Sequence, residues 1–241
     1  MKVKLHRIKE RFTKQEIIDI LIADIILIFA FAFILSTGFG GIFSISTTKD
    51  FFHNFIVYLS ISSIVVTLSF ILHELMHKFA AQHYGAIAGF RTSINGLTIT
   101  LLTSLFGFLI GIPGATMIYA HNFNKEQEAI VSLVGPLTNF VIFGVFLLLK
   151  FIIAPLSTSY LGQLIYLGFF INILLALYNM LPIFPLDGSK ILAWNKEVYI
   201  FMMAVIFVLA WLVIPSILYI IAFMVVIALI FSLFYRHILF Q

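Results

Sequence analysis

Of the 241 residues in this chain, 62% are hydrophobic and 10% are charged, and the mean hydropathy is +1.15. A soluble domain carries charge on about a quarter of its residues, so the composition excludes an ordinary soluble protein and predicts a membrane protein. The chain has no cysteine, which excludes disulfides, thiolate ligands and a catalytic thiol, so any bound metal must use histidine or carboxylate.

The first apolar segment, residues 17–37, follows a basic stretch, residues 1–16, which we expect to be a cytosolic tail. A basic start before an apolar run also describes a signal peptide. This run is about 20 residues long, longer than a usual signal-peptide core, and no A-x-A cleavage site follows it. The sequence therefore predicts a retained first transmembrane helix.

Further apolar segments approach the length of about 20 residues that a helix needs to cross a bilayer core. The predicted spans are 17–37, 55–84, 129–153, 161–181, 198–213 and 216–234. Pro215 separates the last two, so they should form a tight helical hairpin. The expected fold class is a polytopic α-helical membrane protein with six transmembrane helices.

No internal repeat, low-complexity tract or appended soluble domain interrupts this pattern, so we expect a single transmembrane domain over 1–241. Its expected parts are the basic tail 1–16, the core spans 55–84, 129–153 and 161–187, a β or re-entrant segment over 86–119, and a C-terminal helical hairpin over 198–234.

Six spans place both termini on one side of the membrane, and the basic residues indicate which side. Under this model 12 of the 14 Lys and Arg residues lie on the side of the termini, and only Lys49 and Lys150 lie on the other. The positive-inside rule makes the first side cytosolic. The expected location is the cell membrane, and the net charge of +4 indicates topology and contact with anionic lipid, with no nucleic acid as a partner.

The pentad His73-Glu-Leu-Met-His77 lies in the second predicted span, after 18 residues without a charge. Histidines four residues apart lie on one face of a helix, one turn from each other. Both can therefore reach one tetrahedral Zn²⁺, while Glu74 stands beside the metal as a base for its water. A hydrolytic metal site at membrane depth implies that its substrate also lies in the membrane.

Two histidines leave a catalytic zinc site incomplete, because such a site takes three protein ligands and a water. The candidates for the third ligand are His83, Glu126, Glu128 and Asp187. His83 has the spacing of the soluble metzincins, but Ala80 stands where their glycine turns the chain, and in a continuing helix His83 points away. Both glutamates lie in a charged interfacial segment, where solvated carboxylates are expected.

Asp187 follows two prolines in the stretch Asn179-Met-Leu-Pro-Ile-Phe-Pro-Leu-Asp-Gly188, at the end of the fourth predicted span. Each proline removes a helix hydrogen bond and clashes with the preceding turn, so the helix must bend or unwind near Pro182–Pro185. An acidic residue in irregular backbone at membrane depth marks a functional site. Because the second and fourth spans run in the same direction, Asp187 can lie at the depth of the histidines; capping of a helix end is its alternative role.

Two motifs together resemble the site-2 protease family of intramembrane zinc metalloproteases, peptidase family M50. The first is HExxH followed by Ala81-x-x-x-Gly85, and the second is N-x-x-P-x-x-P-x-D-G in a later span. The resemblance covers most of the chain from the second span to Gly188. It is to the minimal form of the family, without PDZ or CBS domain, and departs from the family pattern at Ser189, where a second glycine often follows.

The resemblance implies a role for each matching residue. His73, His77 and Asp187 would be the ligands of one Zn²⁺ per chain, and Glu74 would be the catalytic residue. The segment Gly135-Pro-Leu-Thr-Asn139 resembles the family's G-P-x-x-N, which implies that Asn139 lies near the active site and helps to hold the substrate carbonyl.

A small membrane-associated β element is expected between the second and third spans. From Ile94 to Thr103, apolar and hydroxyl residues alternate with period two, which is a strand pattern. The open edge of such a strand could pair with an unwound substrate; the alternative is a strand that only shields the site from lipid. The candidate pairing residues are Leu97, Thr98, Ile99, Thr100 and Leu101.

The function implied by the resemblance is regulated intramembrane proteolysis, the hydrolysis of peptide bonds in or near the transmembrane segments of single-span or other membrane proteins. One alternative is a transporter that uses the intramembrane His, Glu and Asp cluster as an ion or proton path. Another is an inactive relative that binds transmembrane segments. The glutamate beside the histidine pair favours the protease, because transport requires no base at that position.

Overall fold

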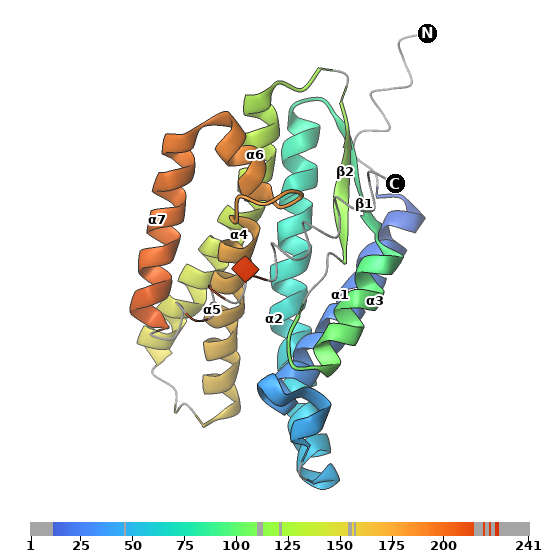
Figure 1. Cartoon of the computed structure of the whole chain (residues 1–241), viewed down its shortest axis with the longest axis vertical. Coiled ribbons are helices and arrows are strands. Elements are labelled where there is room, and N and C mark those ends of the chain that lie inside the picture. The colour runs from blue at the N-terminus through green and yellow to red at the C-terminus, as the bar shows by residue number, and fades with distance from the viewer. Residues whose placement is uncertain are drawn as a thin grey trace. The chain divides into compact units, whose positions relative to one another are not determined.

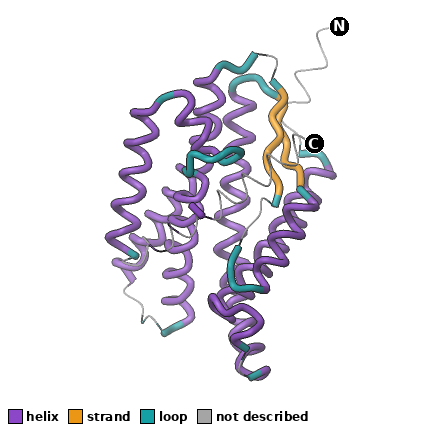
Figure 2. Tube along the Cα trace, viewed as in Figure 1, coloured by secondary structure: helices purple, strands orange, loops and turns teal. Residues whose placement is uncertain are grey.

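A computed structural model describes residues 12–45, 47–109, 113–120, 122–153, 156, 158–214, 219, 222, 225 and 226. These residues form helices and one small sheet (Figures 1 and 2). The chain divides into two compact units, Met1–His121 and Asn122–Gln241.

Five of the described helices are long and apolar enough to cross a membrane. They are α1 (Lys14–Thr37), α2 (Thr48–His83), α4 (Lys125–Ile153), α5 (Tyr160–Asn179) and α7 (Lys196–Val213). They coincide with the first five predicted spans, which confirms a multi-pass helical membrane protein. Most of the sixth predicted span, 216–234, and therefore most of the predicted hairpin lie outside the described residues. Because α1 begins at Lys14, the end of the expected basic tail is helical.

Helices α1 and α2 of the first unit run antiparallel and pack along their length. The Phe33 and Phe51 rings meet edge to face, with their centroids 5.7 Å apart. Further along, the Thr67 hydroxyl donates to the buried Asp24 carboxylate at 2.8 Å. Asp24 thereby satisfies part of its hydrogen-bonding capacity inside an apolar helix pair, where an unpaired polar group is costly.

The sheet has two strands, β1 (Ile87–Thr92) and β2 (Gly114–Tyr119), which pair antiparallel with Phe90 opposite Thr116 (Figure 2). Both strands lie beside the end of α2 that carries the HExxH motif. Alternate residues of β2 are exposed, as expected for a strand with one covered face. Gly114 is required where β2 begins, because a Cβ there would lie 2.4 Å from the Arg91 carbonyl oxygen. The sheet falls within the predicted segment 86–119, so the prediction of a β element between the second and third long helices is confirmed.

The prediction of a strand over Leu97–Leu101 is wrong, because these residues lie in helix α3 (Ile94–Leu105), between the two strands. Hydroxyl groups in α3 donate to carbonyl oxygens four residues back, as Thr98 does to Ile94 at 2.9 Å and Thr100 to Gly96 at 2.8 Å. This bond lets threonine lie inside an apolar helix without an unpaired hydroxyl. Leu97, Thr98, Ile99, Thr100 and Leu101 therefore form no strand edge for a substrate. The signal missed was Ser93, whose hydroxyl caps α3 by accepting the Gly96 amide.

In the second unit, α4 packs against α5 and against the short helix α6 (Asp187–Trp194), and α7 packs against α5 and α6 (Figure 1). Gly168 of α5 lets the two long helices approach closely, since a Cβ there would lie 2.4 Å from the Phe146 ring of α4. Pro136 lies inside α4, which continues on both sides of it. The core of this unit is apolar, with Phe143, Phe169 and Ile173 almost fully buried.

Candidate metal centre

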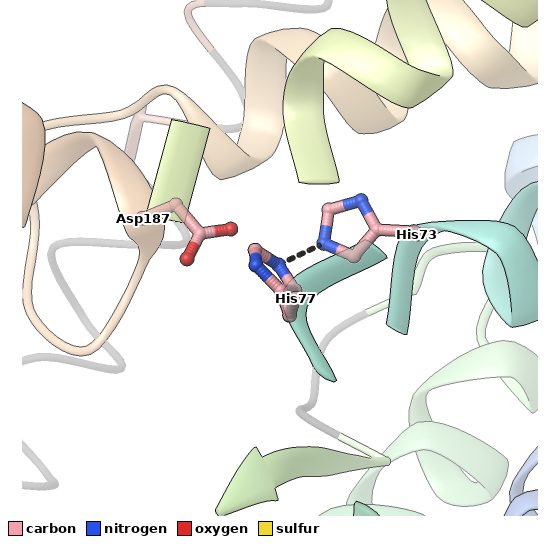
Figure 3. Close-up of side chains that lie close together, drawn as sticks. All are labelled: His73, His77 and Asp187. Carbon is pink, nitrogen blue, oxygen red and sulfur yellow. Dashed lines mark hydrogen bonds between the residues drawn. The ribbon is translucent and has the colours of Figure 1, made fainter. Parts of the chain in front are cut away.

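The two histidines of the HExxH motif lie on one buried face of α2, as the spacing predicts. Their Nε2 atoms face each other at 3.0 Å (Figure 3). A tetrahedral zinc ion with bonds of about 2.0–2.1 Å to two imidazoles holds their nitrogens about 3.3 Å apart. The donor atoms of His73 and His77 thus converge with nearly the separation that one metal ion requires.

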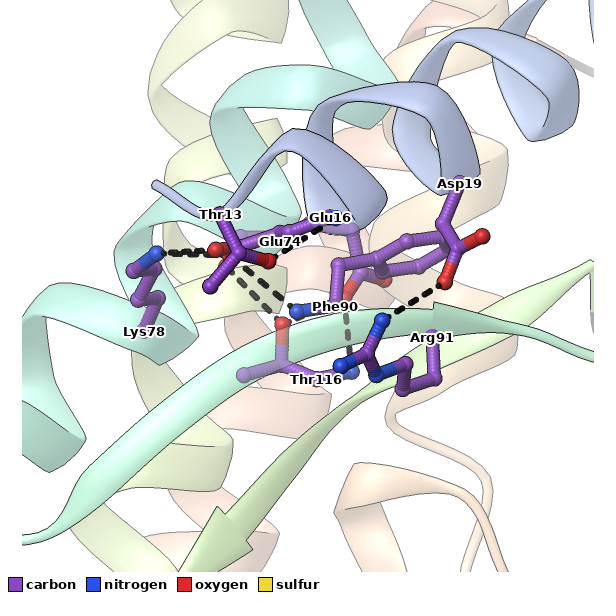
Figure 4. Close-up of polar contacts among 8 residues, drawn as sticks. All are labelled: Thr13, Glu16, Asp19, Glu74, Lys78, Phe90, Arg91 and Thr116. Atoms are coloured by element: carbon purple, nitrogen blue, oxygen red, sulfur yellow. Dashed lines mark hydrogen bonds and ion pairs between the residues drawn. The ribbon is translucent and has the colours of Figure 1, made fainter. Parts of the chain in front are cut away.

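The Glu74 carboxylate is bound by strand β2. Both the amide and the hydroxyl of Thr116 donate to the same oxygen, Oε2, at 3.1 and 2.9 Å (Figure 4). The Thr116 hydroxyl also lies 3.2 Å from the Glu74 carbonyl oxygen. The glutamate next to the histidine pair is therefore held in one orientation by a residue 42 positions later in the chain.

Helix α2 continues through His83, as predicted, and then ends in a Schellman turn. Gly85 adopts φ 88°, a left-handed conformation that favours glycine. The Ala86 amide donates back to the buried Ala81 at 3.0 Å, so the A-x-x-x-G motif corresponds to the end of this helix. His83 is exposed and packs edge to face on Tyr84. Among the described residues, His83 belongs to no group of side chains that could hold a metal ion together.

A buried ion pair joins α1 to α2 one turn after Glu74. Lys78 Nζ lies 2.6 and 2.7 Å from the two Glu16 oxygens, and the side chains are 3% and 4% exposed. Glu16 also accepts the Phe90 amide of β1 at 3.2 Å, and Nζ lies 3.8 Å from the centroid of the Phe12 ring. Sequence reasoning missed this pair, although a lysine inside an apolar helix requires a partner.

Asp187 of the second unit lies where the predicted break in the helix occurs. Helix α5 ends at Asn179, turns follow, and α6 begins at Asp187, so the expected unwinding near the two prolines is confirmed. Asp187 is half-buried and occupies the first turn of α6. Helix N-termini favour a carboxylate, so the first turn of α6 suits the side chain of Asp187.

Gly188 is required by the close approach of α6 to the end of α5. A Cβ at this position would lie 2.1 Å from the Met180 carbonyl oxygen, and Met180 is fully buried. The oxygen is backbone and cannot rotate away. In the D-G pair of the motif, Asp187 supplies the carboxylate, and Gly188 lets α6 begin close to the end of α5.

Asn139 is fully buried in α4 and donates from Nδ2 to Asn172 Oδ1 of α5 at 3.0 Å. Asn172, also fully buried, donates in turn to the Gly168 carbonyl oxygen at 2.8 Å. Sequence reasoning missed Asn172, although a carboxamide inside an apolar span is itself a signal. Glu126 and Glu128, the other carboxylates considered, are exposed in the first turn of α4.

The chain is similar to "Putative zinc metalloprotease MJ0611" of Methanocaldococcus jannaschii, with 38% identity over 195 residues, covering 78% of this chain and 89% of that protein. YwhC of Bacillus subtilis, which carries the same description, is 33% identical over 151 residues, 54% of this chain and 67% of that protein. Zinc metalloprotease MJ0392 of Methanocaldococcus jannaschii is 28% identical over 136 residues, 56% of this chain and 34% of that protein. No family model matches the chain, and no solved structure matches it.

Proposed function

The chain belongs to the site-2 protease family of zinc metalloproteases, and we propose that it hydrolyses peptide bonds in or near transmembrane segments of membrane proteins. The observation that carries the proposal is the buried turn of α2, where two converging imidazoles flank a glutamate in a helix of membrane-spanning length. A site built into such a helix meets substrates that are themselves in the membrane. Transmembrane proteins are therefore the proposed partners, within the lipid bilayer.

One zinc ion per chain is proposed to bind His73, His77 and Asp187. In support, the three side chains form a group that could hold a metal ion, each with one ligand atom to offer (Figure 3). Two neutral imidazoles and one carboxylate, with a position left for water, are a donor set that catalytic zinc sites use.

When bound, zinc would acidify a water and polarise the substrate carbonyl. Glu74 would take the proton from the attacking water and return it to the leaving amine, as a general base and then a general acid. The Asn139 carboxamide would donate to the developing oxyanion. The bond from Asn139 Nδ2 to Asn172 Oδ1 would orient the carboxamide.

Both termini are proposed to be cytosolic in the cell membrane. The 12 basic residues on the side of the termini under the six-span model, against two on the other, support this orientation. HExxH lies in the last third of α2, toward the proposed cytosolic end. Water would therefore reach the site from the cytosol.

The proposal is tested with the purified protein in lipid vesicles, single-span model substrates, and mass spectrometry of the products. Wild type should cleave, and a zinc chelator should stop it. Glu74→Gln should keep its zinc and lose cleavage by about 10²–10⁴-fold, the usual contribution of a general acid–base group. His73→Ala, His77→Ala and Asp187→Ala should lose both zinc and cleavage, whereas the matched control His83→Ala should keep both.

Each variant has an outcome that would contradict its assigned role. Full zinc occupancy in Asp187→Ala would remove this residue from the ligands. Unchanged cleavage by Glu74→Gln would remove the general base. A zinc-loaded wild type that binds the substrates without cutting any of them would point to an inactive relative and overturn the proposed function.

A further inference from the structure

A ring of contacts links Glu74 to both strands of the sheet and to α1 (Figure 4). Glu74 accepts from Thr116 of β2, Thr116 lies opposite Phe90 of β1, and the Phe90 amide donates to Glu16 of α1. Glu16 forms an ion pair with Lys78, which lies in α2 one turn after Glu74. Two connections therefore link this part of α2 to the sheet. Glu74 contacts β2 directly, and Lys78 contacts β1 through Glu16.

The register of the sheet explains why one residue can supply two donors. In an antiparallel pair, opposite residues alternate between those that bond each other across the ladder and those whose amides point outward. The Phe90 amide points outward to Glu16, and the Thr116 amide points outward to Glu74. Position 116 therefore directs its backbone N–H at the glutamate, and its hydroxyl adds the second bond.

We propose that Thr116 is a positioning residue for the reaction, which holds the Glu74 carboxylate by Oε2 so that Oε1 receives the proton of the attacking water. This inference rests on the proposed role of Glu74 as general base. The amide and the hydroxyl of Thr116 both donate to this one oxygen, at 3.1 and 2.9 Å, which fixes the plane of the carboxylate as well as its position. A base must be aligned with the proton that it abstracts.

The kinetic test compares Thr116→Val with Thr116→Ser in the vesicle assay. Valine keeps the β-branched shape and the backbone amide but has no hydroxyl, whereas serine keeps the hydroxyl. Thr116→Val should lower kcat about 10- to 100-fold, the range seen when a residue that orients an active-site group is lost, with KM and zinc content unchanged. Thr116→Ser should restore most of kcat. Thr92→Val, on the neighbouring strand, is the matched control and should behave as wild type.

Amide hydrogen exchange tests the contact without any activity. In protein labelled with ¹⁵N-threonine and ¹⁵N-methionine, NMR would follow the amides of Thr116 and Met117. Glu74→Ala removes the acceptor and should speed exchange at Thr116 at least tenfold, while Glu74→Gln keeps an acceptor oxygen and should not. The Met117 amide points toward β1 by the same alternation, so it should stay protected in both variants.

The outcomes separate this inference from the proposed function. If wild type cleaves and Thr116→Val has the kcat of wild type, Thr116 is no positioning residue, although the protease assignment stands. If the Thr116 amide exchanges equally in wild type and Glu74→Ala, the contact itself is refuted. If wild type does not cleave, the proposed function fails, and with it the catalytic role of Thr116, whatever the exchange shows.

Discussion

The ion pair between Lys78 and Glu16 should be essential to the stability of the first unit, and Lys78→Met tests this. Methionine keeps an unbranched apolar stem of similar reach but has no charge. In wild type the ammonium lies 2.6 and 2.7 Å from the two carboxylate oxygens, with the side chains only 3% and 4% exposed. The substitution leaves the Glu16 carboxylate buried without a cation.

Removing one partner of a buried ion pair costs about 3–5 kcal/mol, because the remaining charge is neither solvated nor neutralised. The Phe90 amide still donates to Glu16 at 3.2 Å, so we expect the lower end, about 3 kcal/mol. The double variant Glu16→Gln, Lys78→Met removes both charges and keeps an acceptor for Phe90. It should recover about 2 kcal/mol of the loss.

Arg91→Met is the matched control, because Arg91 forms a second ion pair with α1. Its Nη1 lies 3.3 Å from Asp19 Oδ2, and the arginine side chain is 50% exposed. Water screens a pair of this kind, so its loss should cost less than about 1 kcal/mol. Both ion pairs join α1 to a neighbouring element, so the difference between the two losses of stability measures the effect of burial.

The assay must report on the first unit alone. Both tryptophans, Trp194 and Trp211, lie in the second unit, so intrinsic fluorescence would not serve. The chain has no cysteine, and Val66 of α2 is 1% exposed. In a Val66→Cys background, thiol reactivity against rising denaturing detergent in mixed micelles should therefore measure the unfolding free energy of this unit.

Two results would refute the reasoning. If Lys78→Met lowers the unfolding free energy no more than Arg91→Met does, water reaches the Lys78–Glu16 pair and burial does not set its strength. Alternatively, the double variant could be as unstable as Lys78→Met alone. The loss would then come from packing around Phe12 and the lysine stem, not from the unpaired carboxylate.

Two further predictions concern the second unit and the topology. Gly188→Ala should lower zinc affinity at least tenfold, because its Cβ would lie 2.1 Å from the Met180 carbonyl oxygen and must displace the start of α6; Gly144→Ala, whose Cβ meets nothing within 4 Å, should keep full affinity. Equal zinc content by mass spectrometry would show that α6 adapts without moving its aspartate. Single cysteines at Lys125 and Lys150, near opposite ends of α4, should react differently with a membrane-impermeant thiol reagent on intact cells. Position 150 should be labelled and position 125 protected, and the reverse pattern would invert the proposed orientation.

Local pattern in the sequence was enough to predict the five long helices that the structure describes and the convergence of His73 and His77. Apolar runs of membrane-spanning length, and histidines four residues apart, depend only on helix geometry and on the cost of exposing backbone to lipid. The helix break before Asp187 could also be predicted from the sequence, because each proline disrupts the helix in which it lies. The strand predicted over Leu97–Leu101 shows where local pattern misleads: threonine alternation looks like a strand, yet in α3 these hydroxyls bond carbonyl oxygens one turn back.

The surroundings of Glu74 were decided only by tertiary structure. Thr116 lies 42 residues from the glutamate that it holds, and Glu16 lies 62 residues from Lys78. Neither partner is singled out by its neighbours in the sequence, because the contacts depend on the register of β1 with β2 and on the packing of α1 against α2. The types of chemical group at the site follow from the sequence. Their orientation depends on nonlocal contacts that exist only once the sheet and the helix pair have formed.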